Sequence, residues 1–104
     1  MTYIVHRNTG EMFPIENQKR DNDRMQISVP VIFAFPGKQK IITQHGTTFD
    51  LSRGGMGFYS EKPLQKGLEL QVYLPDLWNS PKASLVRWCS MKNNNLYRVG
   101  VSFQ

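Results

Sequence analysis

The sequence predicts an all-β fold: one small six-stranded antiparallel barrel of the split type, preceded by an irregular N-terminal arm. Short runs with the alternating hydrophobicity of half-buried strands recur between turns rich in glycine, proline and asparagine, and no stretch of useful length has a helical period. The 104 residues are enough for one modest core. A closed barrel is favoured over an open sheet because closure leaves no exposed edge strands.

Residues 1–18 are predicted to be a flexible N-terminal arm, and residues 19–104 the barrel domain. Tyr3-Ile4-Val5 could pair as a short edge strand, but glycine, proline and asparagine interrupt any longer pattern, so order in the arm should depend on docking. The charged run Lys19-Arg20-Asp21-Asn22-Asp23-Arg24 follows. Taken alone, this run is typical of a solvated segment whose aspartates neutralise its arginines.

The first strand of the barrel is predicted over residues 25–35, where hydrophobic residues alternate from Ile27 onward. Pro30 cannot donate to a ladder, so it should lie at a strand edge or bulge, and Pro36-Gly37-Lys38 predicts a turn. A second strand over residues 41–49 is β-branched and aromatic. Gly46 is expected to mark a bulge in its middle.

The segment Asp50-Leu51-Ser52-Arg53-Gly54-Gly55-Met56-Gly57-Phe58 combines an acid, a hydroxyl and three glycines in what should be a tight turn. Such a turn presents polar groups and lets the backbone approach a partner closely. By itself it is also typical of a plain hairpin corner, in which glycines supply positive φ and Asp or Ser caps its own backbone.

Four further strands complete the predicted barrel. They cover residues 57–59, 68–74, 83–91 and 97–103, and are separated by a connector at 62–67, a loop at 75–81 and an asparagine turn at 93–95. In the strand over 83–91, Val86 and Trp88 are expected on one face, and Leu85, Arg87 and Cys89 on the other.

Charge and composition narrow the function classes. Thirteen Lys and Arg against eight Asp and Glu give a net charge of +5, which favours an anionic partner such as a nucleotide, a nucleic acid or an acidic lipid. The single Cys89 excludes an intramolecular disulfide, and the sequence has neither a membrane-spanning run nor a signal peptide. We therefore expect a cytoplasmic protein without membrane insertion.

Catalysis and metal binding are not expected from the sequence. It contains no Ser, His and acid arrangement, no nucleophile elbow and no Walker loop, so we predict no catalytic residues and no enzymatic activity. His6, His45 and Cys89 are scattered without the spacing of metal ligands. No metal and no cofactor are expected.

The two polar clusters are best considered together, because a hairpin between Arg24 and Asp50 would bring them to one end of the barrel. Arg20-x-x-x-Arg24 followed by Asp50-x-Ser52-x-x-Gly55 resembles the RxxxR and [DN]xSxxG motifs of PilZ domains, bacterial receptors for cyclic di-GMP. The ending Tyr97-Arg98-Val99-Gly100-Val101-Ser102-Phe103 is similar to the final strand of that family. The resemblance extends over about residues 19–103.

The resemblance implies a single-domain receptor that binds cyclic di-GMP and signals through a conformational change read by a downstream protein partner. The implied ligand-binding residues are Lys19, Arg20, Arg24, Asp50, Ser52, Arg53, Gly54, Gly55 and Trp88. An arginine fork suits the O6 and N7 acceptors of guanine, and a carboxylate suits its N1–H and N2–H donors. Trp88 either packs against a base or serves only as a barrel aromatic; Lys19, Arg53 and Arg87 are candidates for phosphate attraction.

Two alternatives stay open. A small basic barrel with aromatic residues could bind single-stranded nucleic acid, but that function predicts basic and aromatic residues spread over one face rather than concentrated beside one turn. The other alternative is a PilZ-type protein-interaction adaptor without a ligand. The retained arginines, Asp50, Ser52 and Gly55 argue against it.

Overall fold

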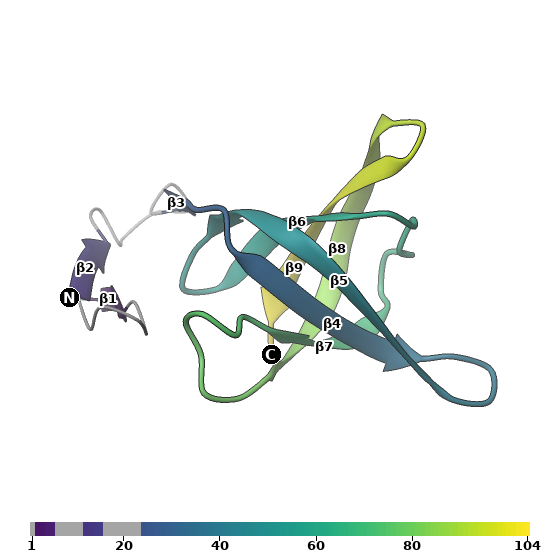
Figure 1. Cartoon of the computed structure of the whole chain (residues 1–104), viewed down its shortest axis with the longest axis horizontal. Helices are drawn as coiled ribbons and strands as arrows, with labels where there is room; N and C mark the ends of the chain where they lie inside the picture. Colours follow the sequence, from purple (N-terminus) through teal and green to yellow (C-terminus); the bar gives the residue numbers. More distant parts are fainter. Residues whose placement is uncertain (1, 6–11, 16–23) are drawn as a thin grey trace.

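The computed structural model describes residues 2–5, 12–15 and 24–104, and these residues are organised almost entirely as strands and turns. The first two strands, β1 (Thr2–Val5) and β2 (Met12–Ile15), pair antiparallel as a small sheet of their own. The second sheet contains β3 (Met25–Gln26), β4 (Pro30–Pro36), β5 (Ile41–Leu51), β6 (Gly55–Ser60), β7 (Glu69–Tyr73), β8 (Lys82–Asn93) and β9 (Leu96–Phe103) (Figure 1).

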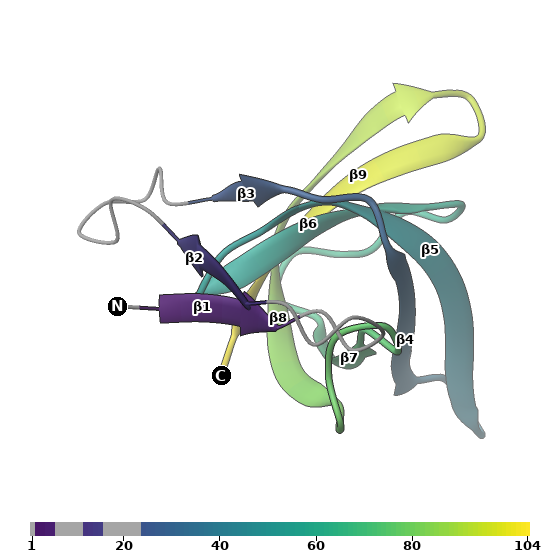
Figure 2. The same cartoon turned by 60° about the vertical axis from the view of Figure 1, so that its left-hand side comes forward.

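Six strands of the second sheet close into a barrel. The order β5-β4-β7-β8-β9-β6 returns to β5 through the β5–β6 pairing, and every pairing is antiparallel. The predicted six-stranded antiparallel barrel is therefore confirmed, with β3 as an additional strand beside β5. In Figures 1 and 2 the β8–β9 and β4–β5 hairpins both project beyond the body of the barrel.

The described part of the expected arm is the small sheet of β1 and β2. The predicted edge strand over residues 3–5 pairs with β2 and not with the barrel. The rest of the arm, residues 6–11 and 16–18, lies outside the described residues. The boundary at residue 18 between arm and barrel domain stays a prediction.

The core fills the barrel with the inward side chains that the alternating patterns predict. Phe33 on β4 and Phe58 on β6 are buried at its centre, with ring centroids 4.7 Å apart. The other buried hydrophobic side chains are Val29, Val31, Leu51, Met56, Leu64, Leu70, Val72, Leu74, Val86, Val99 and Val101.

The predicted strand over residues 25–35 is interrupted between β3 and β4, so one continuous strand was a wrong expectation. The buried Thr48 side chain fills the interruption: its hydroxyl donates to the Ile27 carbonyl at 2.6 Å and accepts from the Val29 amide at 3.0 Å. Pro30 is the first residue of β4, a position compatible with its missing donor.

The bulge expected at Gly46 lies elsewhere on β5. The register shifts between Thr48 and Asp50, which makes Phe49 the extra residue. Gly46 is regularly paired, and its lack of a side chain has a different reason: a Cβ there would lie 2.2 Å from the Tyr59 carbonyl oxygen.

A register shift on β8 explains why the faces predicted for that strand are wrong. The shift lies between Val86 and Trp88, so Arg87 is the extra residue and the alternation reverses there. Val86 is fully buried, Trp88 points outward with 43% of its surface exposed, and Cys89 packs against the core. The expectation that Val86 and Trp88 share a face was wrong.

Candidate functional site

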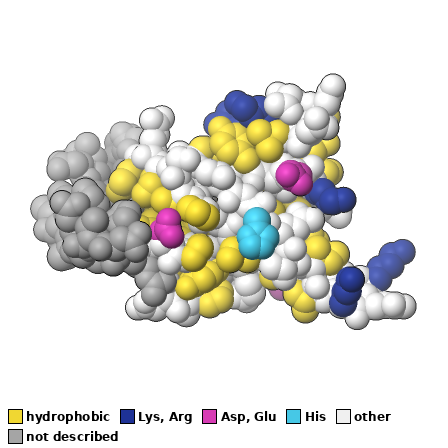
Figure 3. Space-filling model, viewed as in Figure 1, with side chains coloured by type: hydrophobic (Ala, Val, Ile, Leu, Met, Phe, Trp, Pro, Cys, Tyr) yellow, Lys and Arg dark blue, Asp and Glu magenta, His cyan; other side chains and the backbone are white. Residues whose placement is uncertain are grey.

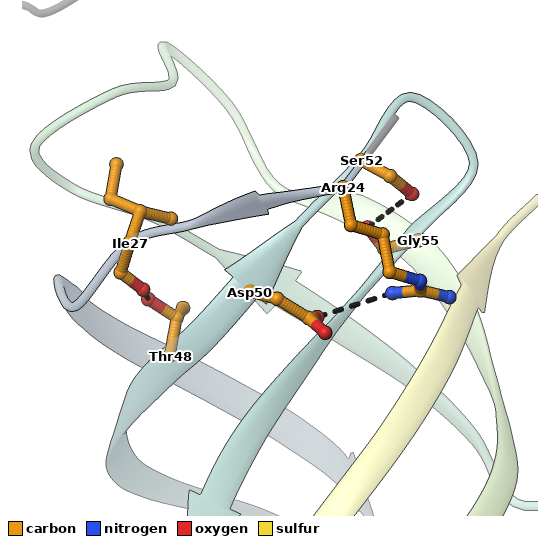
Figure 4. A network of polar contacts seen from close by, with 6 residues as sticks. All are labelled: Arg24, Ile27, Thr48, Asp50, Ser52 and Gly55. Carbon is orange, nitrogen blue, oxygen red and sulfur yellow. Dashed lines mark hydrogen bonds and ion pairs between the residues drawn. The ribbon is translucent and has the colours of Figure 1, made fainter. Parts of the chain in front are cut away.

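The structure brings together the ends of the two sequence motifs. Asp50 lies near the end of β5, opposite Gln26 of β3, and Arg24 immediately precedes β3. The Arg24 Nη1 atom donates to Asp50 Oδ1 at 3.1 Å (Figure 4). The two side chains are 48% and 20% exposed, so the ion pair is accessible to a ligand from solvent.

The turn after Asp50 is closed by Ser52 and not by glycine conformation. The Ser52 hydroxyl donates to the Gly55 carbonyl at 3.2 Å (Figure 4), and the Ser52 amide donates to the same carbonyl at 2.9 Å. The plain hairpin-corner alternative is met in part: Ser52 bonds back to its own turn, but the turn glycines do not supply positive φ, because Gly67 is the one glycine in the described part of the chain with positive φ. Gly55 is instead required for space: a Cβ would lie 2.2 Å from the Val101 carbonyl oxygen.

The tip of the turn is exposed. Arg53 and Gly54 form it, and no heavy atom lies within 4 Å of the position that a Cβ of Gly54 would occupy. The Gly54 carbonyl accepts from the Phe103 amide at 2.9 Å, which ties the tip to the end of β9. The tip is therefore anchored through its backbone while its outer surface is available to a partner.

A hollow of about 530 Å³ lies beside the ion pair. Its lining residues are Gln26, Ile27, Ser28, Thr48, Phe49, Asp50, Tyr59 and Arg98. Two aromatic rings, Phe49 and Tyr59, meet in it with centroids 5.1 Å apart, and the Arg98 guanidinium lies 4.5 Å from the Phe49 centroid. The hollow thus combines a carboxylate acceptor, a cation and aromatic surface, which together can hold a flat ring that carries N–H donors and a nearby anion.

The other predicted site residues lie at different distances from this hollow. Trp88 is close, with its ring centroid 6.4 Å from that of Phe49. Arg87 is exposed on β8 and donates through Nε to the Ser102 hydroxyl at 3.0 Å. Lys19 and Arg20 lie outside the described residues, so the first arginine of the RxxxR motif has no structural account.

Of the residues that line the hollow, only Asp50 was predicted from the sequence, and the missed ones include three with aromatic or cationic side chains. Tyr59 and Arg98 face each other across the β6–β9 pairing, and Phe49 is the extra residue of the β5 bulge. Phe49 directly precedes the motif aspartate, and strand alternation already separated Arg98 from the buried positions of the last strand. These sequence patterns predict which face of its strand each residue occupies. Only the strand register shows that the residues lie next to one another.

A second hollow, of about 260 Å³, lies away from the motifs. It is formed by the ends of β4, β7 and β8 with Ile41 and Gln104, and includes the side chains of Phe35 and Leu70. None of the sequence-predicted binding residues lines it. The motif residues therefore point to the hollow beside Asp50.

Within residues 2–5, 12–15 and 24–104, no group of three or more His, Cys, Asp or Glu side chains is placed to hold a metal ion. The same residues include no helix with the length and apolar character needed to cross a membrane.

Comparisons with known proteins agree with the fold. The family model described as PilZ domain matches residues 18–104. The fold is similar to a solved structure of the PilZ domain of YcgR from Escherichia coli with c-di-GMP, at a TM-score of 0.52 and 20% sequence identity, covering 81% of this chain and 78% of that chain. No curated protein sequence matches the chain. Since the family model covers most of its length, the chain belongs to the PilZ domain family.

Proposed function

We propose that this protein is a receptor for cyclic di-GMP that binds the dinucleotide between the RxxxR motif, Arg20 to Arg24, and the turn from Asp50 to Gly55. The observation that carries the proposal is the contact between Arg24 and Asp50 at the mouth of a hollow with aromatic walls. Membership of the PilZ family supports it, and so does the similarity in fold to a PilZ domain solved with c-di-GMP.

The chemistry of guanine fits these side chains. The Asp50 carboxylate can only accept, so it suits the N1–H and N2–H edge, while the Arg24 fork can donate to O6 and N7 or to a phosphate. Phe49 and Tyr59 supply ring surface next to both groups. In this structure Asp50 is paired with Arg24, so guanine binding exchanges that contact for new ones.

Isothermal titration with cyclic di-GMP and cyclic di-AMP at one salt concentration tests the proposal. Adenine replaces O6 with an amino donor and lacks N1–H and N2–H, so both edges are mismatched. Each lost bidentate contact costs about 1 to 3 kcal/mol, and we expect cyclic di-AMP to bind at least about a hundredfold more weakly. Near-equal affinities would mean that the site recognises charge and stacking instead of guanine edges, and no binding of either would refute the receptor function.

The nucleic-acid alternative is less well supported. On the face in Figure 3, lysine and arginine side chains lie in separate groups at the top and right, with hydrophobic, uncharged and acidic side chains between them, instead of forming one continuous basic track. A competition titration between cyclic di-GMP and a single-stranded oligonucleotide distinguishes the two functions. The oligonucleotide should not displace the dinucleotide.

The output of the receptor is a second part of the proposal. We expect binding without turnover, so cyclic di-GMP should be recovered intact after incubation with the protein. We also expect the ligand to alter a surface that a downstream protein partner reads, in the cytoplasm. Chromatography of the incubated nucleotide checks the first expectation, because a cleaved product would identify an enzyme.

A further inference from the structure

Four strands place four residues of the barrel's outer surface in one row. Asp50 on β5 is opposite Gly57 on β6, Gly57 is opposite Gly100 on β9, and Gly100 is opposite Trp88 on β8. Neighbouring strands lie about 4.8 Å apart, so the row runs over roughly 14 Å from the carboxylate to the indole. The two middle positions carry no side chain.

Aromatic rings occupy the space above both glycines. A Cβ on Gly100 would lie 2.1 Å from Trp88 Nε1 and 2.3 Å from its Cε2. A Cβ on Gly57 would lie 2.3 Å from two ring carbons of Phe49 and 3.0 Å from Asp50 Oδ1. Neither glycine has positive φ, so backbone conformation does not require glycine at these positions. What requires glycine is the room that the two rings take.

The bulges on β5 and β8 bring the rings to this row. Phe49 is the extra residue on β5, and the extra residue Arg87 on β8 turns Trp88 from the core to the outer surface. The next pair on the outer face of β6 and β9, two residues further along each strand, carries side chains on both strands, since Tyr59 is opposite Arg98. The row without side chains therefore coincides with the position of the two aromatic rings.

We propose that Gly57 and Gly100 are positioning residues of the ligand site. By leaving the row bare, they let Phe49 and Trp88 lie close to the sheet in line with the Asp50 carboxylate, where the partly exposed indole offers a stacking surface for a purine base. Any base can stack on an aromatic side chain, so the indole surface adds affinity, whereas Asp50 adds selectivity for guanine. The inference rests on the proposed function, because the base is that of cyclic di-GMP.

A double-mutant cycle on cyclic di-GMP affinity tests the coupling. Trp88→Ala and Gly100→Ala should each weaken binding about tenfold or more, within the range for loss of one stacked base. The combined variant should bind no more weakly than Trp88→Ala alone, because the added methyl group then has no ring to displace. If Gly100 had only a structural role in β9, the two losses would multiply, and that result would overturn the inference.

A second measurement needs no ligand. In a Trp78→Phe background, which retains an aromatic ring next to Phe103, Trp88 is the only tryptophan. Gly100→Ala should then shift Trp88 emission and increase its quenching by acrylamide, whereas Ala83→Val, at an exposed position of Trp88's own strand β8, should leave both unchanged. An unchanged Trp88 signal in Gly100→Ala would overturn the inference even if cyclic di-GMP binds.

The two experiments separate the inference from the proposed function. A wild-type protein that binds no cyclic di-GMP refutes the receptor function, while the Trp88 signal still decides whether Gly100 positions the ring. If Gly100→Ala fails to fold, Trp88→Ala combined with it should restore folding. Failure of the combined variant as well would assign Gly100 a backbone role and overturn the positioning role.

Discussion

The hydroxyl group of Thr48 replaces regular ladder contacts where β3 gives way to β4. It bonds both Ile27 and Val29, and the Thr48 amide also donates to the Val29 carbonyl at 2.9 Å. Because the side chain is almost completely buried, no solvent can replace these contacts. This residue therefore holds the entry of the chain into the barrel, next to the hollow that it helps to line.

Replacing Thr48 with valine tests that role. Thr48→Val keeps the shape but leaves the Val29 amide without its acceptor, so we expect a loss of about 1 to 3 kcal/mol in the free energy of unfolding. Chemical denaturation gives the value. Thr47→Val makes the same change at the neighbouring exposed position and should cost far less; equal losses would contradict the role assigned to the Thr48 hydroxyl.

The Arg24–Asp50 ion pair should matter for binding more than for stability. A partly exposed pair contributes about 0 to 1 kcal/mol to folding, whereas a hydrogen bond to a charged group contributes about 1.5 to 3 kcal/mol. Arg24→Ala and Asp50→Ala should thus each weaken cyclic di-GMP binding by roughly tenfold to a hundredfold and leave the fold intact. Titration and circular dichroism of the same samples provide the measurement.

Lys40→Ala is the control for lost positive charge, since Lys40 is exposed in the turn between β4 and β5 and outside the hollow. It should bind cyclic di-GMP almost as the wild type does. Unchanged affinity in Arg24→Ala or Asp50→Ala would remove that residue from the site.

At the scale of the strand, alternation predicted most elements but missed the irregularities that shape the site. The hydrophobic pattern located β5, β7, β8 and β9 to within two residues at each end. A bulge adds one residue without changing composition, and Phe49 and Trp88 are aromatic residues that suit either face of a barrel. Their outward positions therefore followed from register alone.

The sequence predicted the part of the candidate site that lies in the two motifs, but not the part supplied by distant strands. Motif spacing predicted that Arg24 and Asp50 meet, because a hairpin joins the two motifs, and a hydrogen bond does join their side chains. Tyr59 and Arg98 belong to strands far apart in the sequence, and only the β6–β9 pairing brings them to the hollow. No local pattern encodes that pairing.

The start of β6 offers a prediction at the same scale. Gly55→Ala places a methyl group against the Val101 backbone oxygen, which cannot move without disturbing the β6–β9 ladder, so we expect a loss of about 1 to 3 kcal/mol in unfolding free energy. Gly54→Ala adds the same group where nothing lies within 4 Å, and its unfolding free energy should change by less than about 0.5 kcal/mol. Equal values in denaturant titrations would mean that close packing is not the reason for Gly55.

At the scale of the whole molecule, closure makes the site a property of the complete barrel. The Ser52–Gly55 turn joins β5 to β6, β6 pairs with β9, and the turn tip is bonded to the end of β9. Arg98 comes from β9 and Trp88 from β8, so the site draws on residues from the start and the end of the barrel sequence. A fragment that lacks either end would lack some of the proposed contacts.

Because the site depends on closure of the barrel, the melting temperature of the protein should report ligand binding. An opened barrel separates the hollow's walls, so cyclic di-GMP should bind only the folded protein and raise its melting temperature in proportion to the logarithm of ligand concentration. At a hundredfold excess over Kd the stabilisation is about 2.7 kcal/mol, which for a domain of this size corresponds to a rise on the order of 10 °C. In Asp50→Ala, where binding should be about tenfold to a hundredfold weaker, the same ligand concentration should stabilise the fold by only about 0.4 to 1.4 kcal/mol, so its melting temperature should rise clearly less in a parallel dye-based measurement. An equal rise in that variant would place the nucleotide elsewhere on the barrel.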